Sequence, residues 1–169
     1  MSILEGMGGL LRLVQLSGGQ VEARIRLQKE AFLIAIAGDA AFNSREFVYH
    51  HYGPYSRSLS DVLQTAVALS FLEEQVEGWD DQSVKRYSYR LTPLGEKFLS
   101  QCPEPSQVFR HVVGVCKDKP WRALELAATV RFLETKEGKS RGDAINEALA
   151  LKPATADFLP QANGILASL

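Results

Sequence analysis

The segment Phe47 to Leu63, FVYHHYGPYSRSLSDVL, decides which fold the chain can adopt. Its aromatic and β-branched start predicts a short strand at Phe47 to Tyr49, which Gly53-Pro54 is expected to end. The residues after Pro54 predict an amphipathic helix with Ser58 or Ser60 as its N-cap. The apolar face of that helix comprises Leu59, Val62, Leu63, Ala66 and Leu69. The segment is therefore interpreted as a hinge of the fold, where a strand passes sharply into a helix.

Two helices are predicted before this hinge. Residues 4–16 place apolar side chains at helical spacing, and residues 21–37 are rich in helix-forming residues. The second half of the latter segment is apolar around most of its circumference, so this helix is expected to be central. Its exposed early face is expected to carry Arg24, Arg26, Lys29 and Glu30.

An antiparallel hairpin is predicted after the hinge. Strand-like runs at Leu72 to Val76 and Val84 to Leu91 flank a turn-rich centre at Gly78 to Asp81. The next helix is expected to begin with Thr92 as N-cap and Pro93 at its first position.

The C-terminal part of the chain is predicted to be helical. Two prolines between Cys102 and Ser106 mark a boundary, because proline cannot continue a helix. Helices are expected beyond it at residues 108–115, 121–134, 141–151 and 155–169.

The order helix, helix, short strand, helix, hairpin, helix is typical of a winged helix. We therefore expect a mainly α protein with a small β-hairpin. Residues 1–102 would form the winged-helix domain, a helix-turn-helix-like core plus wing. Residues 103–169 would form a helical C-terminal extension packed on it.

Three segments also carry a family resemblance: RIRLQKEAFLIAIAG (24–38), YHHYGPYSRSLSDVL (49–63) and YRLTPLGEKFL (89–99). They resemble bacterial and phage-associated proteins of the YwgA type, which are related to the SocA and GepA antitoxin-type domains. In that group an LQK helix precedes a YGP turn, a helix and a wing. The resemblance covers residues 25–99 and implies a non-enzymatic regulatory role, on DNA or against a partner protein such as a toxin. Antitoxin-type relatives differ in having a hydrophobic or Trp-bearing segment where this chain has His50-His51.

Composition favours a soluble protein without a cofactor. The 169 residues are 46% hydrophobic, and no apolar run approaches the roughly 18 residues that span a bilayer. The N-terminal segment lacks the features of a secretory leader, so we expect a cytoplasmic protein without membrane attachment. Cys102 and Cys116 are expected to be reduced thiols, and the chain shows no metal-ligand spacing. Cys116 and His111 lack the orienting residue and oxyanion loop of a nucleophilic site, so we expect no enzymatic activity.

DNA binding is weakly supported by charge, because the 19 basic and 20 acidic residues give a net charge of −1. Only Arg57 and Gln64 on the helix after Pro54 are side chains that commonly read bases. An auxiliary patch could comprise Arg24, Arg26 and Lys29. The predicted wing is acidic in its first strand and tip, where phosphate contact would require positive charge; the acidic residues are Glu73, Glu74, Glu77, Asp80 and Asp81.

Protein binding is the function that the sequence favours. Trp79 lies in an exposed acidic turn, and tryptophan is enriched at interface hot spots, so Trp79, Asp80 and Asp81 are predicted to contact a partner. The alternative, which the sequence favours equally, is that Trp79 folds back over the apolar face of the wing. The partner would be another protein or a second copy of the chain, with an antitoxin-like role as one form of this function. The alternative is a DNA-binding transcriptional regulator that uses the helix after Pro54 and the wing. The sequence assigns no role to His50 and His51.

Overall fold

The computed structural model of the protein describes residues 3–78 and 85–169. Trp79, Asp80 and Asp81, the predicted partner contacts, lie outside the described residues. The described helices are α1 (Ile3–Leu16), α2 (Arg24–Ile36), α3 (Arg57–Ala68), α4 (Pro93–Leu99), α5 (Gln107–Cys116), α6 (Trp121–Glu137), α7 (Arg141–Leu151) and α8 (Leu159–Ser168), with the short 3-10 helices η1 (Ser44–Glu46) and η2 (Pro153–Phe158). The strands are β1 (Gln20–Glu22), β2 (Val48–His50), β3 (Gly53–Tyr55), β4 (Leu72–Glu77) and β5 (Arg86–Leu91).

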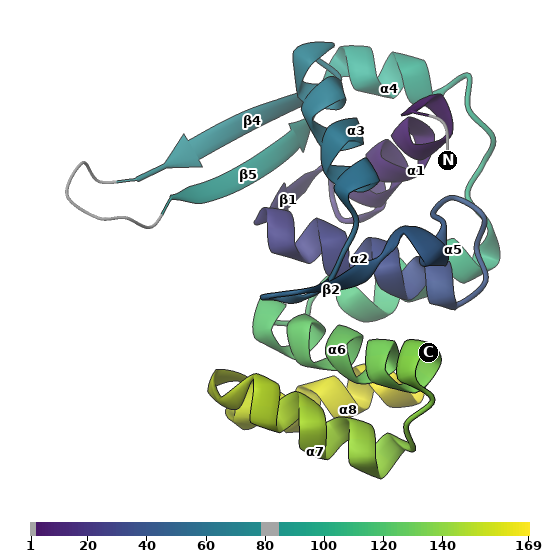
Figure 1. Cartoon of the computed structure of the whole chain (residues 1–169). Helices are drawn as coiled ribbons and strands as arrows, with labels where there is room; N and C mark the ends of the chain where they lie inside the picture. The colour runs from purple at the N-terminus through teal and green to yellow at the C-terminus, as the bar shows by residue number, and fades with distance from the viewer. Residues whose placement is uncertain (1–2, 79–84) are drawn as a thin grey trace.

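The strands form two small antiparallel sheets. Strands β1, β5 and β4 form one sheet in that order, and β2 pairs with β3 in the other. Figure 1 shows the β4–β5 ribbon projecting away from the helices. The prediction of a mainly helical chain with a small hairpin is thus confirmed, including both strands of the hairpin.

Strand β1 was not predicted from the sequence, which favoured one helix over residues 21–37. The strand has only three residues, too few for the alternation that identifies a strand. It pairs with β5 by placing Val21 opposite Tyr89. Ala23 follows at φ 71°, outside helical geometry, and so separates β1 from α2.

The sequence interpretation of Gly53-Pro54 as the break was wrong. Both residues lie inside β3, where Gly53 is opposite His50 and Pro54 is opposite Tyr49, and the turn falls at His51 and Tyr52. We call residues 48–55 the β2–β3 hairpin. Proline fits a small sheet of this kind because it occupies a position that need not donate to a ladder.

The predicted N-cap of α3 was also wrong by a few residues. Ser56 is the cap, and its Oγ accepts a hydrogen bond from the amide of Leu59 at 3.1 Å. Helix α3 therefore begins directly after the hairpin, at Arg57. The predicted start of α4 is confirmed: the Thr92 hydroxyl caps the helix and Pro93 occupies its first position. A Cβ at Gly95 would collide with the carbonyl of Phe71, which explains the glycine in LTPLGEKFL.

The predicted exposed face of α2 is contradicted at two positions. Lys29 is 2% exposed and Glu30 is fully buried, whereas Arg24 is exposed and Arg26 is half-buried. The reason is that α2 is enclosed on several sides, since it packs against α5, α6 and β3. Lys29 is thus removed from the surface on which an auxiliary DNA-binding patch was placed.

Helix α6 connects the C-terminal helices to the rest of the chain. It packs against α2 and β3 on one side and against α7 and α8 on the other, as Figure 1 shows. Aromatic side chains join these layers: the Phe32 ring lies 5.4 Å from Phe47 and 6.0 Å from Phe132. One continuous apolar core therefore spans helices from both ends of the sequence.

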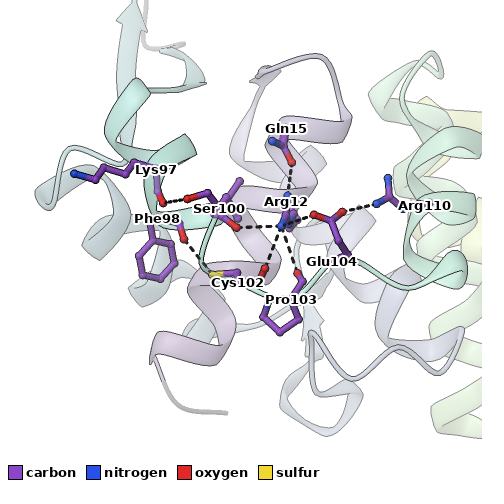
Figure 2. Close-up of polar contacts among 10 residues, drawn as sticks. Arg12, Gln15, Lys97, Phe98, Ser100, Cys102, Pro103, Glu104 and Arg110 are labelled. Carbon is purple, nitrogen blue, oxygen red and sulfur yellow. Dashed lines mark hydrogen bonds and ion pairs between the residues drawn. The ribbon is translucent and has the colours of Figure 1, made fainter.

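Arg12 attaches the segment between α4 and α5 to α1. Figure 2 shows its guanidinium directed at three backbone carbonyls, and it donates to Leu99 O at 3.0 Å and to Cys102 O and Pro103 O at 3.4 Å each. It also pairs with Glu104, which in turn pairs with Arg110. These contacts bind the last carbonyl of α4, which also accepts from Cys102 N, and two carbonyls of the segment that follows the helix.

Among the described residues, no helix combines the length and the apolar character needed to cross a membrane.

Candidate functional site

A cleft of about 470 Å³ lies between α2, α3, the β2–β3 hairpin and the β4–β5 ribbon. Its floor is apolar and includes Ile25, Leu63 and Val67. Its rim is polar and includes Arg24, Ser60, Gln64 and Glu74, while His50, Tyr52 and Tyr55 line the hairpin side. An apolar floor with a few polar groups around it is the usual character of a binding site.

Gln28 joins α2 to the end of the hairpin. Its side-chain amide donates to Ser56 O at 2.9 Å and accepts from Ser56 N at 2.8 Å. Gln28 thus makes the two backbone hydrogen bonds with Ser56 that a residue of a neighbouring strand would otherwise make. The same Nε2 also donates to Ser60 Oγ at 3.1 Å. Because Gln28 follows Leu27 in LQK and Ser56 follows the YGP segment, these bonds explain why the two motifs occur together.

Replacement of Gln28 by glutamate is expected to lower the free energy of unfolding by about 2 kcal/mol, since the new carboxylate cannot donate to Ser56 O. Urea denaturation at pH 7 measures this loss. Gln64→Glu is the matched control, because Gln64 is exposed on α3 and its replacement should change stability by less than about 0.5 kcal/mol. Equal losses in the two variants would contradict the assigned role of Gln28.

Lys29, Glu125 and Lys152 form a buried group behind the hairpin, which we call the lysine cluster. Lys29 Nζ donates to Pro54 O at 2.7 Å, and Lys152 donates to His51 O. Lys152 also pairs with Glu125 across 3.1 Å, with both side chains about 95% buried. Two lysines from distant parts of the sequence therefore bind one carbonyl in the hairpin turn and one in β3.

Burial lowers the pKa of Lys29 to about 7 from the ordinary value of 10.5. The carboxylate of Glu125 opposes this shift, and the positive charge of Lys152 adds to it. The desolvation of the ammonium dominates because α2 is enclosed at this position. Lys29 therefore exchanges its proton near neutral pH in the folded protein.

The stability of the protein is expected to rise with pH because of Lys29. Between about pH 7 and 10.5 the unfolded chain holds a proton on this lysine that the folded chain has released, so the free energy of unfolding increases with pH. Below pH 7 both states are protonated and the contribution is constant. Denaturation from pH 6 to 10 should show a rise that is missing in Lys29→Met. The raised pKa values of Tyr89 and Cys116 affect the unchanged protein and Lys29→Met equally, so they cancel in the comparison. If the free energy of unfolding of the two proteins changed in parallel with pH, the lowered pKa of Lys29 would be contradicted.

The charges on the β4–β5 ribbon compensate one another. Arg24 Nε donates to Tyr89 Oη at 2.7 Å, Tyr89 donates to Glu74 at 2.7 Å, and Arg24 pairs with Glu74 at 3.2 Å. The Arg24 guanidinium also lies 3.8 Å from the centre of the Tyr87 ring. On the other face of the ribbon Arg90 pairs with Glu73, and Glu77 is opposite Arg86. The acidic residues predicted in the first strand thus face arginines.

The cleft brings together only some of the residues that the sequence assigned to nucleic acid. Arg24, Lys29 and Gln64 line it, whereas Arg57 is exposed on α3 outside it. Arg26 points elsewhere, pairing with Glu30 at 2.8 Å and donating to Cys116 O at 3.1 Å and to Lys119 O.

Sequence reasoning missed the polar residues that complete the cleft. Tyr89 and Glu74 could have been linked by their pairing in the predicted hairpin, where they are directly opposite. Tyr52 and Tyr55 carried no such signal, because their position depends on the hairpin turn. His50 now has a place at the cleft, with its ring 5.1 Å from Tyr55, while the ring of His51 lies 4.8 Å from His50.

Metal and thiol chemistry have no geometric support in the described part of the chain. Within it, no group of three or more His, Cys, Asp or Glu residues could hold a metal ion. Cys116 is fully buried, which raises the pKa of its thiol, and His111 contacts Ser168 O at 2.6 Å through its Nε2.

Comparison with known proteins gives a distant relative. The chain is 27% identical to the uncharacterized protein YwgA of Bacillus subtilis (strain 168) over 128 residues, which are 75% of this chain and 74% of the relative. This similarity supports the resemblance to YwgA-type proteins drawn from the sequence motifs. No protein-family model matches the chain. The relationship to SocA and GepA domains stays a prediction.

Proposed function

We propose that the protein is a non-catalytic winged-helix protein that acts by binding a partner protein. The fold assignment rests on the order of α1, β1, α2 and α3, followed by the β4–β5 ribbon as the wing. The three-stranded sheet β1-β5-β4 supports it, because a third strand at the base of the wing is usual in such domains. Residues 103–169 would be a helical extension that packs on this domain through α6.

The observation that carries the functional proposal is the combination of an apolar cleft with compensated charges. A wing that follows DNA phosphates needs free cations. Here Arg24 is engaged by Glu74 and Tyr89, and Arg90 is engaged by Glu73. The apolar floor of the cleft instead suits an anchoring side chain of a partner protein. An antitoxin-like role would be one form of this function.

Site-specific photo-crosslinking in the native host tests the proposal. A photoreactive residue at position 64 lies on the rim of the cleft, and one at position 94 is the control, because Leu94 is 49% exposed on α4. We expect one protein species to be crosslinked from position 64, to be absent from position 94, and to be lost when Val67→Trp fills the floor. Equal crosslinking from both positions, or crosslinking only to a second copy of the chain, would contradict a distinct partner.

DNA binding through α3 is the second candidate, favoured by the exposure of Arg57 and Gln64 on one helix beside the ribbon. A mobility shift on the region upstream of the gene, titrated with salt, tests it. A specific complex that is weakened by Arg57→Ala would support DNA binding and count against partner binding as the main function.

A further inference from the structure

The cleft has the shape of a site for one large apolar group. Its floor residues Ile25, Leu63 and Val67 come from α2 and α3, and Tyr52 and Tyr55 of the hairpin line one side. A volume of about 470 Å³ exceeds that of a single side chain, so the anchor and part of its backbone could enter together.

The polar groups around the cleft do not balance in charge. Arg24 and Glu74 neutralise each other at 3.2 Å, and Tyr89 donates its hydroxyl hydrogen to the same carboxylate. Lys29 lines the same cleft and adds a positive charge below about pH 7. When Lys29 is protonated, the lysine cluster to which it belongs contains two ammonium groups but one carboxylate, Glu125, which pairs with Lys152.

The ammonium group of Lys29 has more N–H donors than it has accepting partners. An ammonium group carries three hydrogens, and in the described part of the chain its Nζ donates one hydrogen bond, to Pro54 O. A buried cation with unused donors is costly, and an anionic oxygen beside it removes that cost. The side chain is 2% exposed and lines the cleft, so the cleft is the route by which such an oxygen would arrive.

We propose that the cleft recognises a partner through a large apolar or aromatic group carrying a carboxylate, with the apolar part on the floor and the carboxylate directed toward Lys29. This inference rests on the proposed function, since it specifies the chemistry of the partner's anchor. The terminal carboxylate of a chain ending in an apolar residue, or an acidic residue next to an aromatic one, has this chemistry.

Binding of such an anchor is coupled to the proton on Lys29. The charged groups that face this lysine are Glu125 from α6 and Lys152 from the segment before η2, and His50 shares the cleft from the hairpin. A carboxylate in the cleft favours the protonated lysine, so affinity falls as the pH rises above about 7. The variant His50→Gln lacks the imidazole, so any fall in affinity with pH that remains in it cannot come from His50.

Phenylacetate is a minimal probe of this chemistry, and phenylacetamide is its neutral match. Titration of the nitrogen-15-labelled full chain should shift the amide resonances of Ser60, Gln64 and Val67 with phenylacetate. Phenylacetamide should bind roughly tenfold more weakly than phenylacetate, as expected when a charged hydrogen bond is replaced by a neutral one. In His50→Gln, affinity for phenylacetate should still fall by about tenfold or more between pH 6 and 9.

Two variants separate binding from folding. Val67→Trp should abolish the shifts while the spectrum stays folded, and Leu94→Trp, at an exposed position on α4, should leave them unchanged. Lys29→Met should remove the preference for phenylacetate over phenylacetamide. Equal affinity of the two probes, shifts that persist in Val67→Trp, or no shifts at all would overturn the inference.

The two proposals fail in different ways. If phenylacetate binds in the cleft but position 64 crosslinks no partner, the partner proposal fails and the chemistry of the cleft stands. If a partner is crosslinked from position 64 but the carboxylate has no advantage over the amide, the inference fails and partner binding stands.

Discussion

Replacement of Glu125 by glutamine is expected to lower the free energy of unfolding by about 3 to 5 kcal/mol, because it leaves two buried lysines without a carboxylate. Glu125 lies 3.1 Å from Lys152 and is the negative group that opposes the depressed pKa of Lys29. Glutamine keeps the shape of the side chain and removes only its charge. The loss measures what an uncompensated buried cation costs, rather than the net worth of the ion pair.

Urea denaturation of Glu125→Gln should also show a dependence on pH. The loss should be larger at pH 6 than at pH 9, because Lys29 is protonated below about pH 7 and then faces Lys152 without a compensating charge. Glu147→Gln is the control: this residue pairs with Lys139 at 2.7 Å on the surface, and its loss should be within about 0.5 kcal/mol. A loss no greater in Glu125→Gln than in this control would contradict the role given to the lysine cluster.

Replacement of Gly53 by alanine is expected to destabilise the protein by about 3 kcal/mol through two separate effects. Gly53 has φ 88°, a conformation that disfavours residues with a Cβ. A Cβ at this position would also lie 2.7 Å from Thr129 Oγ1 on α6, far inside van der Waals contact. The hairpin would therefore move away from α6, and Pro54 would be drawn away from Lys29. Thermal and urea denaturation measure the loss.

Two comparisons separate strain from collision at Gly53. Gly138→Ala has the same backbone problem, at φ 69°, but nothing within 4 Å of the added atom, so it should cost only about 1 kcal/mol. Thr129→Ala removes the colliding oxygen, and the double variant with Gly53→Ala should recover at least about 1 kcal/mol relative to additivity. Additive losses would show that the hairpin does not rest on α6 as closely as described.

Most of the helices were predictable because each has a local signal, although the single helix expected at residues 155–169 is divided into η2 and α8. Helix α7 begins at Arg141 and ends at Leu151 as predicted, since Ser140 caps it and Gly138 separates it from α6. The β4–β5 ribbon was predictable for a similar reason, because Tyr87, Tyr89 and Leu91 alternate with polar residues. Signals of this kind need no knowledge of the rest of the fold.

The candidate site was predictable only in part, because it is assembled by tertiary contacts. The sequence singled out Arg24 and Gln64, which do line the cleft, but it could not tell Arg24 from Arg26, two positions apart on one helix. Lys29 was expected on the surface because lysine is rarely buried. Its burial depends on Glu125 and Lys152, which lie about a hundred residues away in the sequence.

Gln28 and Lys29 together fix the spacing that the chain can tolerate. Gln28 and Lys29 are consecutive in α2, and they bind Ser56 and Pro54, which lie two positions apart in an extended segment. These two bonds fix the number of residues between their partners. An insertion or deletion between Gly53 and Ser56 would put one of these bonds out of register. The connection from Gly38 to Asn43 is held by other contacts, since Phe42 is buried in the core and stacks on Phe109. A search for distant relatives should therefore allow no gap within YGPYS.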